Sequence, residues 1–148
     1  MQPIKTILLV AISIQVWFFA FEAKGEVRYA SFFLTTGSDA VDAGDNVVFN
    51  DQVTLSGIKY NNTTGVFTLP AGVYTVTYFF APYEMPAVNM YVNNQLILNS
   101  PLGGNSTVLR LTSVKNTLTL KYISPGSFSA PSANQSWASV AISQINSP

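Results

Sequence analysis

Cysteine and histidine are both absent from this 148-residue chain, and only 9% of its residues are charged. Their absence excludes disulfides, His/Cys zinc sites, thiol redox chemistry and the Ser-His or Cys-His pairs that activate a nucleophile. Seven basic and seven acidic side chains cancel, so there is no basic stripe of the kind that binds nucleic acid. The chain is instead 48% hydrophobic and 13% aromatic, which excludes an acidic disordered protein and suits a single folded domain.

The first 25 residues predict a secretory signal peptide. A short start that ends in Lys5 is followed by an apolar run over Thr6–Phe21 and then by small residues, which favours cleavage before Glu26. A retained membrane anchor is the alternative, but a spanning helix needs roughly 20 apolar residues, and polar residues interrupt this shorter run. We therefore expect a mature domain over residues 26–148, secreted or at the cell surface, with no membrane span after cleavage.

Beyond this segment the apolar residues alternate as they do in β-strands, and no stretch shows the 3.6-residue repeat of an amphipathic helix. The clearest strand is Val73–Phe80, which is bounded by Gly72 and Pro82. Asn93 and Asn94 predict a two-residue hairpin turn, because Asn tolerates a positive φ. The other predicted strands span residues 29–35, 46–49, 65–69, 87–92, 95–99, 107–111, 117–123 and 137–145, with a long loop over 124–136. Many short strands divided by turn residues are typical of a β-sandwich or barrel.

Residues 47–80 carry a distinctive pattern: an apolar-Phe pair, a Tyr-Asn segment, a Gly-x-Phe-Thr-x-Pro turn and a Gly-x-Tyr strand start. This stretch resembles the globular head of complement component 1q and the wider tumour-necrosis-factor-like jelly-roll superfamily. The C-terminal domains of collagen-like spore-surface glycoproteins are also similar. The matching residues are Phe49, Asn50, Tyr60, Gly65, Phe67, Pro70, Gly72 and Tyr74, and weaker likeness in the flanks extends the resemblance over about residues 28–146.

The resemblance implies an all-β fold, a ten-stranded antiparallel jelly-roll β-sandwich, in which the motif residues have structural roles. It also implies a tight homotrimer that packs through aromatic and aliphatic faces. A monomer that keeps all its aromatic residues in the core is the alternative. Such relatives usually carry a collagen stalk before the head, but this sequence has no Gly-X-Y repeat, so we expect the head without that stalk.

Asp39, Asp42 and Asp45 form the one acidic cluster, in a Gly-containing segment that ends at Asn46. We call residues 39–46 the acidic turn. Three carboxylates and an amide oxygen could coordinate Ca²⁺, which takes about six to eight oxygen ligands, and no other metal or cofactor is predicted. The spacing differs from that of an EF-hand loop, and a solvated turn at a strand end is the alternative.

Four asparagines lie in N-glycosylation sequons at predicted turns: Asn61, Asn62, Asn105 and Asn134. Their use depends on a source that has the glycosylation machinery. In a chain with so many Asn, Ser and Thr residues, a few sequons also arise by chance.

Tyr83, Phe128 and Trp137 are candidates for a platform on which a sugar ring could stack. Burial in the core is the alternative for aromatic residues in or beside strands. Glu84 and an aspartate such as Asp45 would be the carboxylates of a glycosidase pair, but no spacing in the sequence supports the short separation that this chemistry needs. We therefore predict no catalytic residues and no enzymatic activity.

These features predict a secreted, non-enzymatic jelly-roll module that forms a homotrimer and acts as an extracellular or surface structural or recognition protein. Its expected partners are further copies of itself and a glycan or a surface protein, and not nucleic acid. A monomeric carbohydrate-binding β-sandwich is the first alternative. A wall- or polysaccharide-active enzyme is the second, because one fold can host many functions.

Overall fold

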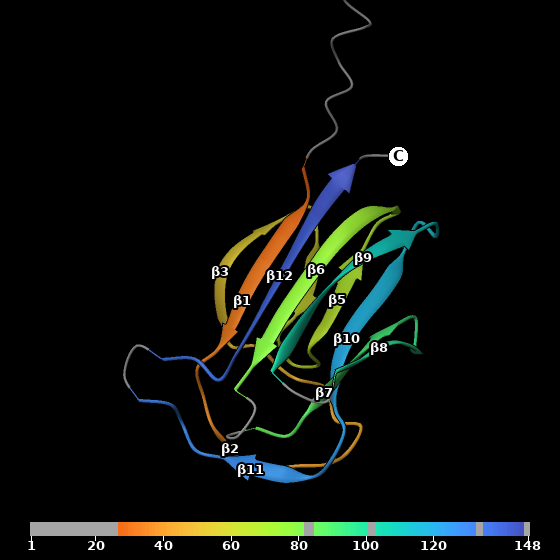
Figure 1. Cartoon of the computed structure of the whole chain (residues 1–148). Helices are drawn as coiled ribbons and strands as arrows, with labels where there is room; N and C mark the ends of the chain where they lie inside the picture. Colours follow the sequence, from red (N-terminus) through yellow and green to blue (C-terminus); the bar gives the residue numbers. More distant parts are fainter. Residues whose placement is uncertain (1–26, 82–84, 101–102, 133–134, 147–148) are drawn as a thin grey trace, which may run out of the picture.

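The computed structural model describes residues 27–81, 85–100, 103–132 and 135–146, and the predicted signal peptide lies outside them. These residues form two five-stranded antiparallel sheets packed face to face, with a two-stranded sheet at one end (Figure 1). In pairing order, the front sheet contains β3 (Asp51–Ser56), β1 (Tyr29–Leu34), β12 (Ala138–Asn146), β6 (Gly72–Phe80) and β9 (Gly104–Leu111). The back sheet contains β4 (Lys59–Asn61), β5 (Val66–Leu69), β10 (Asn116–Tyr122), β7 (Val88–Val92) and β8 (Gln95–Ser100). The end sheet pairs β2 (Ser38–Val41) with β11 (Gly126–Phe128).

The path of the chain between the sheets is that of a jelly roll. From β5 onward the chain crosses to the front sheet at β6, returns at β7 and β8, crosses again at β9, returns at β10 and ends in the front sheet at β12. This confirms the prediction of an all-β, ten-stranded antiparallel sandwich, to which the end sheet adds two short strands. Within the described residues there is no helix of the length and apolarity that crossing a membrane requires.

Several strands of the structure differ from the prediction. No strand forms at 46–49, where Asn46 makes only an isolated bridge to Lys121 before the chain enters β3. The sequence did not predict β3, because this edge strand is largely exposed and lacks alternation. Strands β2, β4 and β11 are three or four residues long and also lack a periodic signal, and β11 lies inside the segment that was predicted to be a loop.

Alternation along β6 shows how the sequence produces the two-layer core. Tyr74, Val76 and Tyr78 point between the sheets and are buried, whereas Thr77 and Phe79 point outward and are exposed. Each apolar side chain that is fully buried in this way stabilises the fold by roughly 1.5–3 kcal/mol. Residues from both sheets complete the core, among them Phe32, Phe49, Phe67, Leu69, Met90, Leu118, Leu120 and Ile142.

A cluster of aromatic rings joins the two sheets at the residues of the recognised motif. The ring centroid of Tyr60 lies 4.4 Å from those of Phe32 and Phe67, and Phe49 lies 6.3 Å from Phe67. The Tyr60 hydroxyl donates to the carbonyl of Phe49 over 3.0 Å and accepts from the Phe49 amide over 2.7 Å. Burial raises the pKa of Tyr60 to about 12, despite the opposing effect of its bond to the Phe49 backbone. The motif tyrosine therefore binds the chain segment before β3 to the start of the back sheet.

Tight backbone turns explain other motif positions. Gly65 has a φ of +69°, and a Cβ there would lie 2.3 Å from the carbonyl oxygen of Val47, so any side chain would collide with backbone. The Tyr74 hydroxyl donates to the Pro70 carbonyl over 3.2 Å, which fixes the turn into β6. The contacts of Gly65 and Tyr74 thus fix two backbone turns of the fold.

The predicted hairpin at Asn93 and Asn94 is confirmed. Their φ values are +50° and +63°, as a two-residue turn between twisted strands requires. The Asn93 side chain also accepts a hydrogen bond of 2.9 Å from the Thr117 amide, which ties the turn to β10. The tolerance of asparagine for a positive φ therefore determines this connection between β7 and β8.

Candidate functional site

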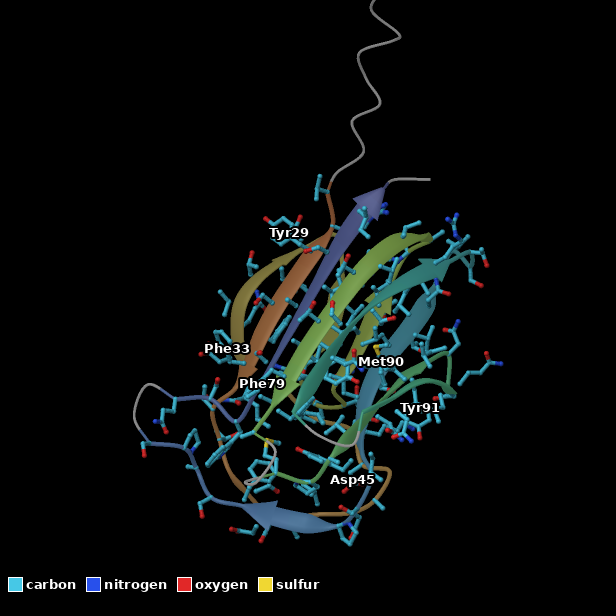
Figure 2. All side chains as sticks on the ribbon, viewed as in Figure 1. Tyr29, Phe33, Asp45, Phe79, Met90 and Tyr91 are labelled. Carbon is cyan, nitrogen blue, oxygen red and sulfur yellow. The ribbon has the colours of Figure 1, made fainter. Side chains whose placement is uncertain are left out.

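The outer surface of the front sheet exposes large apolar side chains. Tyr29 and Phe33 on β1 are 39% and 36% exposed, Phe79 on β6 is 52% exposed and Val108 on β9 is 61% exposed. Figure 2 shows Tyr29, Phe33 and Phe79 on these strands. Strand register places Phe33 and Phe79 on either side of Ser139 of β12, so both rings lie in one row across the sheet. We call this surface, from β1 to β9, the outer front face.

The positions between these rings are small and uncharged: Ser31, Thr75, Thr77, Ser106, Ser139, Ala141 and Ser143. Within the described ranges, no charged side chain occupies an outward position on β1, β12 or β6. The nearest charges are at the margins, Asp51 on β3 and Arg110 on β9. A partner could therefore cover this face without removing water from ions or immobilising long charged side chains.

A second exposed apolar surface lies where β8 ends the back sheet and β9 ends the front sheet. Leu96 and Ile97 of β8 are each about half exposed. A cavity of about 230 Å³ opens between the two strands, and Ile97 and Leu109 line it together with Arg110 and several polar residues. We call this the open edge. It differs from the outer front face, so the molecule carries two unlike apolar surfaces, which a head-to-tail contact between identical copies requires.

Hydrogen bonds within the acidic turn and between this turn and β10 hold it in place. The Asp45 carboxylate accepts from the Asp42 amide over 2.8 Å, and the Asp45 carbonyl accepts from the Tyr122 amide over 3.0 Å. Burial, and secondarily the charge of Asp45, raises the pKa of Tyr122. Over the described part of the chain, no group of three or more acidic side chains is placed to hold a metal ion. The structure thus does not bring Asp39, Asp42 and Asp45 together into the Ca²⁺ site considered from the sequence.

The predicted stacking platform does not form from its described members. Phe128 is buried, with its ring 6.3 Å from that of Tyr122, so its assignment to a ligand platform is wrong and it belongs to the core. Trp137 is half-buried against the same core, and its indole N–H donates to the carbonyl of Ser129. Tyr83 lies outside the described residues. Apolar periodicity could not separate these alternatives, because the short β11 pairing that buries Phe128 has no sequence signal.

The sequons differ in their local structure. The Asn61 side chain accepts from the amides of Thr63 and Thr64 at 2.9 and 3.1 Å, which closes the turn between β4 and β5, and Asn62 is exposed in that turn. Asn105 lies within β9, so its placement at a turn was wrong. Asn134 lies outside the described residues.

A cavity of about 550 Å³ lies beside the end of β1 and is lined by Phe33, Thr35, Asp51, Pro131, Ser132, Gln135 and Ser136. Asp51 is the one ionisable side chain among these lining residues. A glycosidase would need a second carboxylate across the cavity. Glu84, the glutamate considered from the sequence, lies outside the described residues, and Asp45 does not line this cavity.

A scan against protein-family models finds no match, and a search of the curated proteins finds none either. Solved structures do match. The globular domain of zebrafish complement 1qA protein superposes with a TM-score of 0.57 at 14% identity, covering 82% of this chain and 99% of that one. The structure of Eiger TNF from S. frugiperda gives a TM-score of 0.58 at 14% identity, covering 82% of this chain and 94% of that one. The chain therefore has the tumour-necrosis-factor/complement-1q-like jelly-roll fold, which confirms at the level of the fold the resemblance predicted from residues 47–80.

Proposed function

We propose that this protein is a secreted, non-enzymatic jelly-roll module that assembles into a homotrimer and serves as an extracellular structural or recognition unit. The outer front face carries this proposal, because Tyr29, Phe33 and Phe79 stand exposed on strands without outward charges. Large apolar side chains that are exposed together on one surface mark sites of association. Secretion is supported by the signal-like sequence of residues 1–25.

A ring of three copies accounts for both exposed apolar surfaces. A two-fold dimer that paired two outer front faces would leave Leu96 and Ile97 of the open edge in water. If the open edge of one copy packs on the outer front face of the next, each copy uses both surfaces, and closure of the ring prevents open-ended fibres. Obligate interfaces of this apolar kind bury about 2,000–5,000 Å² in total. Three copies are also what the likeness to complement 1q-like heads implies.

The non-enzymatic part of the proposal rests on side-chain chemistry. The chain has no histidine or cysteine, and the lining described for the cavity of about 550 Å³ holds a single ionisable group, Asp51. General acid-base or nucleophilic catalysis needs at least two cooperating groups within hydrogen-bond reach.

The mass of the mature chain in solution tests the assembly. One chain over residues 26–148 weighs about 13 kDa, so a trimer gives about 40 kDa by light scattering after size-exclusion chromatography. A mass near 13 kDa at micromolar concentration would contradict the proposal and favour the monomeric carbohydrate-binding sandwich. A mass near twice that of one chain would contradict the ring.

A further inference from the structure

The outer surface of the back sheet carries a groove with a lysine on either side. Strand register places Lys59 of β4, Thr68 of β5 and Thr117 of β10 in one row across three neighbouring strands. Two cavities of about 330 and 360 Å³ open along this row, and Lys59, Thr68 and Lys115 line both of them. Because they share these residues, the two cavities adjoin, and we call them together the back-sheet groove.

The remaining lining of the back-sheet groove carries no charge and mixes polar residues with Val66, Pro70 and Val114. Asn61, Thr64 and Thr117 contribute amide and hydroxyl groups, while the Tyr60 hydroxyl is already bonded to the Phe49 backbone. Among the described residues, neither lining contains an aspartate or a glutamate. The two ammonium groups therefore face a surface that holds hydrogen-bonding groups and no competing carboxylate, which suits an anionic ligand that also carries hydroxyls.

Positively charged and negatively charged side chains are also concentrated at opposite ends of the sandwich. Strand pairing puts one set of cations at the end where β1 begins and β12 ends: Arg28, Lys59, Arg110 and Lys115. The described carboxylates lie toward the opposite end, near the end sheet, where Figure 2 shows Asp45: Asp39, Asp42, Asp45 and Asp51. The field of the whole domain thus steers anions toward the end that holds the back-sheet groove.

We propose that the back-sheet groove binds an anionic polysaccharide, a sugar chain that bears carboxylate or sulfate groups. The row from β4 to β10 spans two inter-strand spacings, about 10 Å, so the two lysines can contact acidic groups on adjacent sugars. Threonine and asparagine side chains suit sugar hydroxyls. The lining exposes no free aromatic platform of the kind that stacks nucleobases, which disfavours a single-stranded nucleic acid.

The β4 side of the back-sheet groove stays open in the proposed assembly, whereas the turn that holds Lys115 also supplies Ser113 and Asn116 to the cavity of the open edge. The back-sheet groove lies on the sheet that faces away from the outer front face, and β4 is at the opposite edge of the back sheet from β8. The inference deepens the recognition role proposed above and rests on it for avidity, since three grooves in a ring would engage one long polymer together. Binding to a single groove does not require the ring.

The test compares binding of the mature chain to heparin, polygalacturonate, neutral dextran and inorganic polyphosphate. The groove variant is Lys59→Gln with Lys115→Gln. The control is made one charge at a time: Lys121→Gln is compared with Lys59→Gln and with Lys115→Gln, and it removes the same charge at a residue that lines neither cavity. Lys121 lies elsewhere on the back sheet, with its ammonium 5.2 Å from the centroid of the Tyr91 ring.

We expect the wild type to bind heparin or polygalacturonate but not dextran, with a Kd that rises roughly tenfold between about 50 and 200 mM salt as counterions are released. The groove variant should bind about tenfold or more weakly, and the control should stay within about twofold. A loss in Lys121→Gln equal to the losses in Lys59→Gln and Lys115→Gln, or no binding to either acidic polysaccharide, would overturn the inference. Polyphosphate bound more tightly than both polysaccharides would overturn the choice of ligand.

Light scattering on the same samples separates the two proposals. A wild type of trimeric mass that binds neither acidic polysaccharide contradicts the groove alone. A monomeric wild type whose binding depends on Lys59 and Lys115 contradicts the trimer alone. A groove variant that keeps the wild-type mass shows that its loss of binding does not arise from a change in assembly.

Discussion

Replacement of Phe79 by serine gives the sharpest test of the outer front face. A phenylalanine side chain presents about 200 Å² when fully exposed, and 52% of Phe79 is exposed in the single chain, so assembly would cover about 100 Å². At about 25 cal/mol per Å² this is roughly 2.5 kcal/mol per chain and roughly 7.5 kcal/mol for three chains. Serine adds neither charge nor bulk and matches Ser139, which neighbours Phe79 on β12.

The assay is the mass of the mature chain over a dilution series. A loss of roughly 7.5 kcal/mol raises the trimer dissociation constant by more than five powers of ten, and the midpoint concentration, which varies as its square root, by roughly 500-fold. These values are upper bounds, because association also restricts motion and side chains. The matched control is Ile123→Ser, since Ile123 is 40% exposed but follows β10 in the other sheet. If wild type, Phe79→Ser and Ile123→Ser dissociate at the same concentration while all remain folded, the outer front face is not the interface.

Two further substitutions test the fold, and one calcium experiment tests the acidic turn. Tyr60→Phe removes both hydrogen bonds to the Phe49 backbone and should lower the free energy of unfolding by about 1–2 kcal/mol in urea titrations. Because the folded pKa of Tyr60 is raised from 10.0 to about 12, its contribution is complete below pH 10 and lost as the pH rises through 12, so Tyr60→Phe should flatten that alkaline decline. Gly65→Ala should lower the free energy of unfolding by about 2 kcal/mol or more, measured by thermal melting. The loss should exceed that of Gly44→Ala, because Gly44 has a φ of +93° but a Cβ there would meet nothing within 4 Å. For the acidic turn, we expect EDTA and CaCl₂ to give melting temperatures within about 1 °C, and a rise of several degrees with CaCl₂ would restore the Ca²⁺ hypothesis.

The sequence predicted best what depends on local pattern. Alternation along Val73–Phe80 identified the central strand, and Asn93 and Asn94 identified a turn, because side-chain period and positive φ are local properties. The same strand carries aromatic residues on both faces, and the structure exposes the outward one, Phe79. The core position of Phe128 was not predictable, because it depends on the pairing of β11 with the distant β2.

The back-sheet groove had no sequence signal at all. Lys59 begins β4 and Lys115 precedes β10, so the two lysines are far apart in the sequence and form no charge run. They come together only because β5 pairs with β4 on one side and with β10 on the other. A binding surface assembled by long-range pairing of this kind becomes visible only when the strand order is known.

The two ends of the domain leave the front sheet side by side, with Tyr29 opposite Ser143 and the Arg28 carbonyl accepting from the Gln144 amide over 2.8 Å (Figure 1). A pull applied between the termini would load the hydrogen bonds between β1 and β12 one after another, starting from this pair. Bonds that open in sequence resist far less force than bonds that must shear together. A load applied between the two termini would therefore separate β1 from β12 at low force, before the rest of the front sheet is strained.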